Sequence, residues 1–384
     1  MATGTRTTYT DTAPQKRSLA DMIGMIDWTE APLLKLLGLN NESRFRLLNW
    51  PRTKVEWLED SMSPRSTTLA EALDNSETGV DVATGTGSYF KEGDVIKADS
   101  ELMYVSSVST DTLTVIRGFG GSTAATHDNA GALIIATIAR IEGADYDTGH
   151  TTAMNNPYNY TQILSEAVTV TGSEQVDEKY GMSDTLAYNI GKLIGGGDGV
   201  GQKGKAGKLP ILLQQTFYHG LRAAGSASTA RAMSGFNGYV TTNVTNAASA
   251  ALTRKMIEDA MQACFLAGGA PETIVCNAWA RRKISSFYED FIRTERSEER
   301  GGSSITTIVT DFGELEVLFD RWCPTDHLYI LEKDKMGWIT YRPFNIYDRA
   351  SVGDYVIKDV LGEYSFVLMN ETAHARIHTF STSK

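Results

Sequence analysis

Residues 140–171 contain the feature that most constrains the fold, a long polar segment followed directly by a regular β-strand. The segment Arg140–Pro157 has one isoleucine and consists mainly of Gly, Ala, Asp, Thr and Asn. A connection of this length and composition is uncommon inside a compact monomer, because it has no hydrophobic face to bury. In the strand that follows, Leu164, Val168 and Val170 lie on one face. We therefore expect an arm outside the core, attached to a strand that belongs to the core.

Three tyrosines in this region, Tyr146, Tyr158 and Tyr160, suggest what the arm contacts. Tyrosine combines a large apolar area with a polar hydroxyl group and is enriched at protein interfaces. Disorder is the other interpretation of so polar a segment. The aromatic spacing favours contact with a neighbouring molecule.

The overall composition excludes several classes of protein. Hydrophobic residues make up 41% and charged residues 22% of the 384 positions, which is typical of a globular chain with room for two or three domains. A net charge of −11 argues against a dedicated nucleic-acid-binding protein. No run approaches the roughly 18 apolar residues of a membrane span, and the N-terminus lacks a secretory signal. We expect a protein that is made in the cytoplasm and enters no membrane.

Two short apolar stretches interrupt an otherwise polar N-terminus. Ser18–Asp27 has helical spacing with Ser18 as a possible N-cap, and Glu30–Gly38 is a second apolar turn. We expect an N-terminal arm that docks elsewhere. The alternative is that these residues form the first helix of the core.

Between residues 83 and 136, strand signals follow one another at short intervals. The expected strands are Asp94–Lys97, Glu101–Val105, Thr112–Arg117 and Ala132–Ala136. This spacing is typical of a small antiparallel barrel or sandwich. The polar legs on either side, each about 15 residues long, could each span roughly 50 Å. We therefore expect the module to be inserted into an extended hairpin.

Downstream, the pattern changes to helices and an α/β unit. Helical periodicity at 183–194 and at 209–224 is interrupted by a glycine-rich tract. Leu252–Cys264 predicts a helix, Glu272–Cys276 a short buried strand and Ala278–Phe291 a further helix. Further strands are expected within 306–341, at Tyr364–Met369 and at Ala375–His378.

The glycine-rich tract Gly195–Lys208 resembles two phosphate-binding motifs. Gly199–Ala206 nearly matches GxxxxGK[ST], and its glycines also match GxGxxG. Both matches lack the necessary context, because Ala206 replaces the hydroxyl group that would bind magnesium and the tract follows a helix. We interpret the tract as a flexible surface or interface loop, with a phosphate-handling enzyme as the rival interpretation.

Other residues capable of catalysis or metal binding form no recognisable motif. His374 and His378 are four positions apart in strand-like sequence and have no third ligand. The three cysteines form no CxxC pair, and no GxSxG motif is present. We therefore expect no enzymatic activity, no cofactor and no bound metal.

The order of the expected parts resembles that of the major capsid protein of tailed phages. These parts are, in order, an arm, an extended hairpin, a β-module, a split spine helix, an α/β core and a final strand. That protein has the Hong-Kong-97 fold, and the similarity is greatest to a phage capsid family formerly described only as a domain of unknown function. The segments that resemble this family are Trp57–Asp60, Ile141–Asp145, Asn159–Ile163, Val170–Glu174 and Met233–Phe236. An insertion module common in such proteins is similar to Gly93–Ile96, Glu101–Met103 and Thr114–Gly118 with His127.

The resemblance implies an α+β fold of the Hong-Kong-97 capsid type with a small all-β insertion domain. The implied parts are an N-terminal arm (1–48), an extended loop (49–82 and 137–165), a β-rich insertion domain (83–136), a peripheral domain with the spine helix (166–229 and 365–384) and an axial domain (230–364). The extended loop is expected to contact an adjacent subunit. The candidate contact residues are Trp57, Glu59, Asp60, Tyr146, Tyr158, Tyr160 and Gln162.

A protein of this family is expected to assemble itself as hexamers and pentamers into an icosahedral phage head. The capsid of the virion would enclose double-stranded DNA, contacted non-specifically on the inner face, and the subunit would be made in the bacterial host cytoplasm. The N-terminus is too short for a built-in scaffolding domain, so we expect a separate scaffolding protein, a portal and a possible decoration protein as partners. An encapsulin-like shell protein or another phage structural protein, such as a tail protein, is the alternative.

Overall fold

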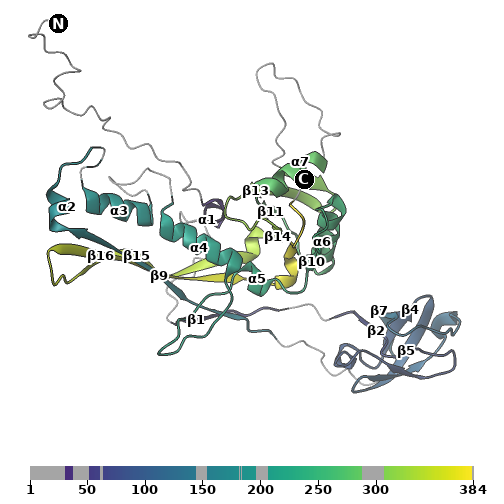
Figure 1. The fold of residues 1–384 in the computed structure, drawn as a ribbon. Coiled ribbons are helices and arrows are strands. Elements are labelled where there is room, and N and C mark those ends of the chain that lie inside the picture. The colour runs from purple at the N-terminus through teal and green to yellow at the C-terminus, as the bar shows by residue number, and fades with distance from the viewer. Residues whose placement is uncertain are drawn as a thin grey trace, which may run out of the picture. The chain divides into compact units, whose positions relative to one another are not determined.

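The computed structural model describes residues 31–37, 52–60, 64–143, 154–180, 182, 184–195, 206–287 and 307–382. The chain divides into two compact units, each treated by itself (Figure 1). Met1–Trp57 and Pro157–Lys384 form the first, which we call the α/β unit. Leu58–Asn156 form the second, which we call the β-barrel unit.

The β-barrel unit is a six-stranded antiparallel sheet in the order β2-β7-β4-β5-β6-β3. Its strands are β2 (Ser66–Thr68), β3 (Gly79–Asp81), β4 (Asp94–Ala98), β5 (Glu101–Ser109), β6 (Thr112–Ile116) and β7 (Ala132–Ile138). The four longer strands confirm the strands expected at 94–97, 101–105, 112–117 and 132–136. Inward side chains of the unit form a separate core that includes Leu69, Val80, Ile96, Met103, Val105, Leu113, Val115 and Leu133.

Backbone hydrogen bonds between β2 and β3 close this sheet into a barrel. The amide of Ala70 donates to the carbonyl of Asp81 at 2.8 Å, and that of Ala83 donates to Thr68 at 3.0 Å. The module therefore begins well before residue 83, and the assignment of 66–82 to the extended loop is wrong. β2 and β3 belong to the barrel because they are the two outer strands of its sheet and connect to each other.

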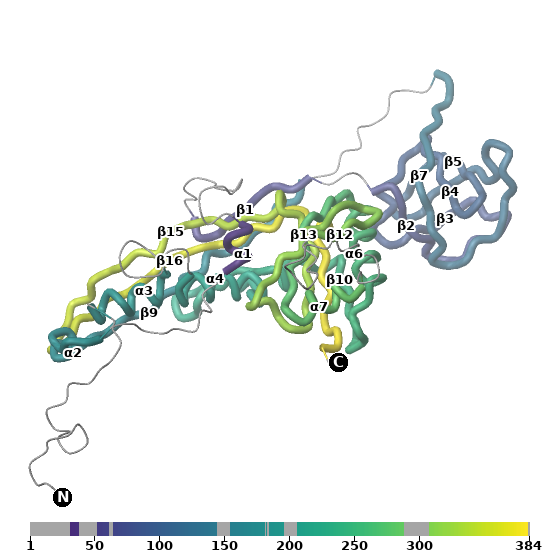
Figure 2. Tube along the Cα trace, turned by 90° about the horizontal axis from the view of Figure 1, so that it is seen from above, coloured from purple at the N-terminus to yellow at the C-terminus, as the bar shows by residue number. Residues whose placement is uncertain are grey.

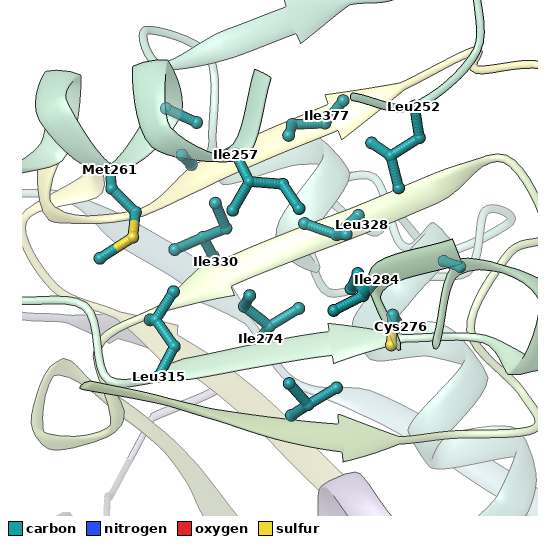
Figure 3. Close-up of a cluster of buried hydrophobic side chains, with 14 of the residues drawn as sticks. Leu252, Ile257, Met261, Ile274, Cys276, Ile284, Leu315, Leu328, Ile330 and Ile377 are labelled. Atoms are coloured by element: carbon teal, nitrogen blue, oxygen red, sulfur yellow. The ribbon is translucent and has the colours of Figure 1, made fainter. Parts of the chain in front are cut away.

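The centre of the α/β unit is a second six-stranded sheet in the order β10-β17-β14-β11-β13-β12. Its strands are β10 (Val244–Asn246), β17 (Ala375–His378), β14 (His327–Leu331), β11 (Thr273–Cys276), β13 (Gly313–Phe319) and β12 (Thr307–Thr310). One face is covered by α6 (Arg254–Leu266) and α7 (Ala278–Phe287), as the helix–strand–helix pattern predicts. The core between them includes Ile257, Met261, Ile274, Ile284, Leu315, Leu328 and Ile330 (Figure 3).

The opposite face of the central sheet packs on a second core. Its side chains alternate with those of the first, so Val275 and Tyr329 point to this side. They meet Phe217 of α4 (Lys208–His219) and Phe236 of α5 (Phe236–Tyr239). The unit therefore has helices on both faces of this sheet.

A long three-stranded antiparallel sheet supports the interrupted helix. β9 (Gln162–Thr171), β16 (Tyr355–Leu368) and β15 (Met336–Arg349) lie in the order β15-β16-β9, followed along the chain by α2 (Gly172–Val176) and α3 (Thr185–Ile194). Figure 2 shows α3 and α4 alongside these strands. Val168 and Val170 of β9 are buried against Leu193 and Leu209, which confirms the apolar face expected for this strand.

The break between α3 and α4 has a defined geometry. Gly195 ends α3 with a φ of 97°, a left-handed conformation that favours glycine. The amide of Gly207 then donates to the carbonyl of Ile194 at 3.2 Å, which brings the two helix ends together. The interruption of the spine helix is therefore confirmed, although residues 196–205 of the glycine tract lie outside the described residues.

One expected boundary within the α/β unit, between residues 364 and 365, is wrong, and segments on both sides of it were assigned to the wrong part. Residues 336–364 were expected with the central α/β sheet, but β15 and β16 pair with β9 in the long sheet. Residues 365–384 were expected with the spine helix, but β17 pairs with β10 and β14 in the central sheet. The physical reason is that β16 is one continuous strand across residue 364, so no domain boundary can lie there.

The short helix α1 (Pro32–Leu36) belongs to the core of the α/β unit. Leu33 and Leu34 are 0% and 1% exposed and pack in the same cluster as Leu213 and Phe217. For these residues the interpretation as an arm that docks elsewhere is wrong, and the alternative of a first core helix is correct. The helix pattern at 18–27 lies outside the described residues.

A network around Glu101 holds the loops of the barrel together. Its buried carboxylate accepts hydrogen bonds from Arg117 at 2.7 and 2.8 Å, from the amides of Ala125 and Gly118, and from the ring of His127 at 3.0 Å. Burial alone would raise the pKa of Glu101, but these donors outweigh it and lower the pKa to about 2.

Leu33→Ala should lower the free energy of unfolding by about 2–5 kcal/mol, because it removes a fully buried side chain. Lys35→Ala on the exposed face of the same helix is the matched control and should change it by less than about 0.5 kcal/mol. Urea unfolding followed by tryptophan fluorescence measures both. Equal stability of the two variants would show that α1 is not part of the core.

Glu101→Gln should destabilise the barrel by about 3–5 kcal/mol, because Arg117 would remain buried without its counter-charge. The stabilisation from the Glu101 carboxylate should be complete above pH about 4.5 and should decline as the pH falls toward about 2. Hydrogen exchange of barrel peptides, corrected for intrinsic rates, measures both effects in the full chain. Asp128→Asn, at an exposed position, is the control. Wild-type protection of the β5 and β6 amides in Glu101→Gln would contradict this assignment.

Candidate assembly site at the base of the extended loop

The two chain segments that connect the α/β unit to the rest of the molecule form a short antiparallel ribbon. β1 (Lys54–Glu56) pairs with β8 (Tyr158–Tyr160), with Val55 opposite Asn159. The amide of Trp57 adds a hydrogen bond to the carbonyl of Pro157 at 3.1 Å. We call this element the base ribbon.

Apolar side chains attach one face of the base ribbon to the long sheet. Val55 and Trp57 are 1% and 7% exposed and pack against Ile339 and Val367. The ring centroid of Trp57 lies 5.9 Å from that of Tyr239. Burial of a side chain of this size stabilises the attachment by roughly 1.5–3 kcal/mol.

Asn159 fixes the position of the second strand of the ribbon. Its side chain is fully buried, and its amide group donates to the carbonyls of Phe366 at 2.7 Å and Ser234 at 3.2 Å. Its carbonyl oxygen accepts from the amide of Ser234 at 2.9 Å. Because both ends of the side chain are satisfied, only an amide of this length fits without leaving a buried group unpaired.

A buried ionic cluster lies beside the ribbon. The carboxylate of Glu363 is 1% exposed and accepts hydrogen bonds from Thr161 at 2.5 Å, from Arg342 at 2.9 Å and from Arg231. Burial opposes ionisation of Glu363, but these donors outweigh it and lower its pKa. Arg231 also donates to the backbone carbonyl of Thr161 at 2.9 Å, so the cluster holds the chain where the ribbon passes into β9.

The outer side of the ribbon has a cationic environment around Tyr158. The guanidinium carbon of Arg222 and the ammonium of Lys54 lie 4.0 and 4.2 Å from the centre of its ring. Arg222 also donates to the backbone carbonyl of Tyr158 at 2.8 Å. The ring of Tyr160 meets that of Tyr158 edge-on at 5.7 Å. These contacts hold an aromatic surface in a fixed orientation.

The structure brings most of the predicted contact residues to this site. Trp57 is buried, Tyr158 and Tyr160 are half-buried, and the Gln162 side chain accepts from the amide of Met233 at 3.2 Å. On the barrel side of the unit boundary, Glu59 pairs through its backbone with Asn155, and Asp60 is exposed. Tyr146 lies outside the described residues. Contact of these side chains with a second subunit stays a prediction.

Sequence reasoning missed the residues that hold the site together, namely Asn159, Glu363, Arg231 and Arg342. Asn159 stands at the inward position between two tyrosines, and Glu363 stands next to the apolar end of β16. The sequence signal for such a residue is a polar side chain at an inward position of a strand. This signal does not identify the residue that pairs with it, since Arg231 and Glu363 are 132 positions apart.

Burial keeps the thiol of Cys276 and the ring of His374 in their neutral forms. Burial raises the pKa of the Cys276 thiol to about 12 and lowers that of His374 to about 4, so neither is charged near neutral pH. Within the described ranges, no cluster of three or more potential ligands is arranged to hold a metal ion. No helix among those residues is long and apolar enough to span a membrane.

Asn159→Asp should loosen the base ribbon, because the new carboxylate would face the carbonyls of Phe366 and Ser234. We expect a loss of about 3 kcal/mol in the opening free energy of the ribbon, measured by hydrogen exchange of peptides covering 53–57 and 158–162. The same substitution at the exposed Asn155 is the control and should leave exchange of these peptides unchanged. Wild-type protection in Asn159→Asp would show that Asn159 does not hold the strand.

Comparisons with known proteins identify the family. No curated protein sequence matches the chain. Among solved structures, the capsid asymmetric unit of cyanophage A-1(L) has a TM-score of 0.53 at 11% identity and covers 98% of this chain and 100% of that one. The capsid of an empty GTA particle has a TM-score of 0.52 at 9% identity, with 98% and 99% covered. Microbacterium phage Oxtober96 has a TM-score of 0.50 at 10% identity, with 97% and 98% covered.

These similarities show a shared fold, the Hong-Kong-97 capsid fold expected from the sequence. The family follows from the sequence itself. A model of the family described as SU10 major capsid protein matches residues 2–381, nearly the entire length. The chain belongs to the SU10 major capsid protein family.

Proposed function

We propose that this major capsid protein assembles as hexamers and pentamers into an icosahedral phage head that encloses double-stranded DNA. The family match over residues 2–381 is the observation that supports this function most strongly. A structural shell subunit needs extensive contacts with its own copies and no active site. The same match does not favour the encapsulin-like or tail-protein alternatives, nor the phosphate-handling enzyme.

The base ribbon and the residues beside it are the proposed inter-subunit contact. Leu58, Ile141 and Met154 are 67%, 66% and 63% exposed, although each is a large apolar side chain. Covering them with a neighbouring subunit would stabilise the assembly by roughly 25 cal/mol per Å² of apolar area. In this proposal Glu59, Asp60, Tyr146, Tyr158 and Tyr160 contribute polar and aromatic contacts.

Trp57 and Gln162 have a different role in this proposal. Both already make contacts within their own chain, Trp57 with the long sheet and Gln162 with the amide of Met233. They would hold the ribbon in the orientation that a neighbour recognises. A ribbon that is ordered before assembly lowers the entropic cost of association.

Further partners follow from the proposed role. A shell with five-fold and six-fold positions for one subunit needs size control, for which we propose a separate scaffolding protein. A portal would provide the entry for DNA, and a decoration protein is a further possible partner. The inner face would contact the packaged DNA non-specifically, and the chain would be made in the bacterial host cytoplasm.

Assembly should depend on the exposed apolar residues beside the ribbon. In cells that also express the scaffolding gene, the wild-type chain should form closed shells, seen by negative-stain electron microscopy and by light scattering. The double variant Leu58→Ser/Met154→Ser should fold normally but give far fewer shells. Ile116→Ser, at a side chain 56% exposed on the barrel, is the control and should assemble normally.

Two outcomes would contradict the proposal in different ways. A wild-type chain that remains a monomer or dimer under every condition would refute the capsid function. Normal shells from the double variant would leave that function intact and refute the contact surface.

A further inference from the structure

One end of the central sheet has two histidines at directly opposite positions. His327 of β14 faces His378 of β17 in the antiparallel register, and the centroids of their stacked rings lie 5.8 Å apart. Both residues are half-buried. Like charges at opposite positions of antiparallel strands destabilise the pairing of the strands. Protonation of both rings would therefore weaken the sheet at this end.

The charged groups around His378 oppose its protonation. Arg376 lies two positions earlier on β17 and therefore on the same face of the sheet. The carboxylate of Asp326 acts in the opposite direction, but it is bonded to Nδ1 of His327 at 2.8 Å. On the other neighbouring strand, β10, the residue opposite His378 is the uncharged Asn246. Burial first, and then the charges of Arg376 and His327, lower the pKa of His378.

The backbone next to this pair is strained. Thr379, directly after His378, has a φ of 57°, and Ala248 and Ser249 in the loop after β10 have φ values of 47° and 64°. These are left-handed conformations, which are unfavourable for residues other than glycine and most of all for a β-branched residue such as threonine. Such strain persists only where the surrounding contacts enforce it.

Backbone hydrogen bonds join the two strained segments, the loop 247–251 and residues 378–381. We call this element the C-terminal clasp. Its amide donors and carbonyl acceptors are Ala247 with His378 at 2.9 Å, Ser249 with Thr379 at 2.7 Å and Ser381 with Ala250 at 2.9 Å. The hydroxyl oxygen of Thr379 also lies 2.7 Å from Nδ1 of His378. The histidine that resists protonation is therefore part of the element that holds the strain.

We propose that the C-terminal clasp is a pH-sensitive element, closed near neutral pH and opened locally in mild acid by protonation of His378. A proton on this ring places a positive charge beside Arg376 and His327, and the strained backbone then favours release. Phe380 is 3% exposed and stacks on Trp279, so it anchors the segment while the clasp opens. This inference goes beyond the proposed function and does not depend on a shell.

The sign of the pH effect follows from the lowered pKa of His378. The folded clasp binds this proton more weakly than the unfolded chain does, so its stability falls as the pH drops below the ordinary histidine value of roughly 6.5. The Glu101 carboxylate of the barrel titrates at a lower pH. A change in the clasp between about pH 7.5 and 5.5 can therefore be separated from acid effects on the barrel.

Hydrogen exchange of the full-length chain tests the proposal. Peptides covering 244–251 and 375–382 are compared at about pH 7.5 and 5.5, with each rate corrected for its intrinsic pH dependence. We expect protection of the wild-type clasp to fall by roughly threefold or more at the lower pH. His378→Gln should abolish this change, because glutamine takes up no proton. His219→Gln, at an exposed histidine that ends α4, is the matched control and should respond like the wild type.

A second test varies the strain and leaves the charge unchanged. Ala248→Gly relieves a left-handed conformation at an exposed position and should raise protection of the clasp at both pH values. Ala250→Gly lies in the same loop at a residue without a positive φ and should not raise it. Both variants add the freedom of a glycine to the unfolded chain, so the strain is what distinguishes them.

Three results would overturn the proposal. The first is equal protection of the wild-type clasp at the two pH values, and the second is an unchanged pH response in His378→Gln. The third is a loss of protection that extends equally to the barrel peptides, because the opening would then be global. Protection in Ala248→Gly no higher than in Ala250→Gly would contradict the role of strain.

Discussion

The α/β unit depends on β16, a strand of 14 residues whose side chains contribute to three hydrophobic clusters. Val360 packs with Leu193 beneath α3, whereas Phe366 and Leu368 pack with the side chains around α1 and α4. Between them lies Glu363, an ionised group that burial would exclude unless its partners were fixed. Thr161, Arg231 and Arg342 provide those partners, so one charge holds β9, β15 and β16 together.

This arrangement separates the contacts within the subunit from the surface that we propose for assembly. The buried side of the base ribbon is attached through Trp57 and Asn159, while Leu58 and Met154 beside it remain exposed. Order at the base lowers the cost of fixing the contact surface during assembly. In the β-barrel unit, two backbone hydrogen bonds join the end of β2 to the end of β3, so the two outer strands of its sheet are connected.

Much of the fold could be predicted from local patterns. β4 to β7 are short strand-forming runs separated by turn residues, and the structure contains these strands and β17 within a few residues of the expected bounds. β2 and β3 were missed because each has only three residues, which is too short for a pattern to be recognised in a largely polar segment. The true extent of β16 was also missed, since Asp359, Gly362 and Glu363 break its apolar pattern and are tolerated only through tertiary contacts. The burial of α1 also depends on tertiary contacts and could not be predicted, because the sequence of the helix does not indicate which residues it packs against.

The site was predictable only in part. The aromatic spacing made Tyr158 and Tyr160 candidate contact residues, and the structure places both in the base ribbon. Their partners come from distant positions, such as Arg222 over the ring of Tyr158, and a single sequence does not reveal such pairs. A cryo-electron-microscopy map of the assembled shell tests the central claim most directly. It should show the base ribbon and the side chains of Leu58 and Met154 covered by an adjacent subunit. A map in which these residues face solvent in every subunit would contradict it.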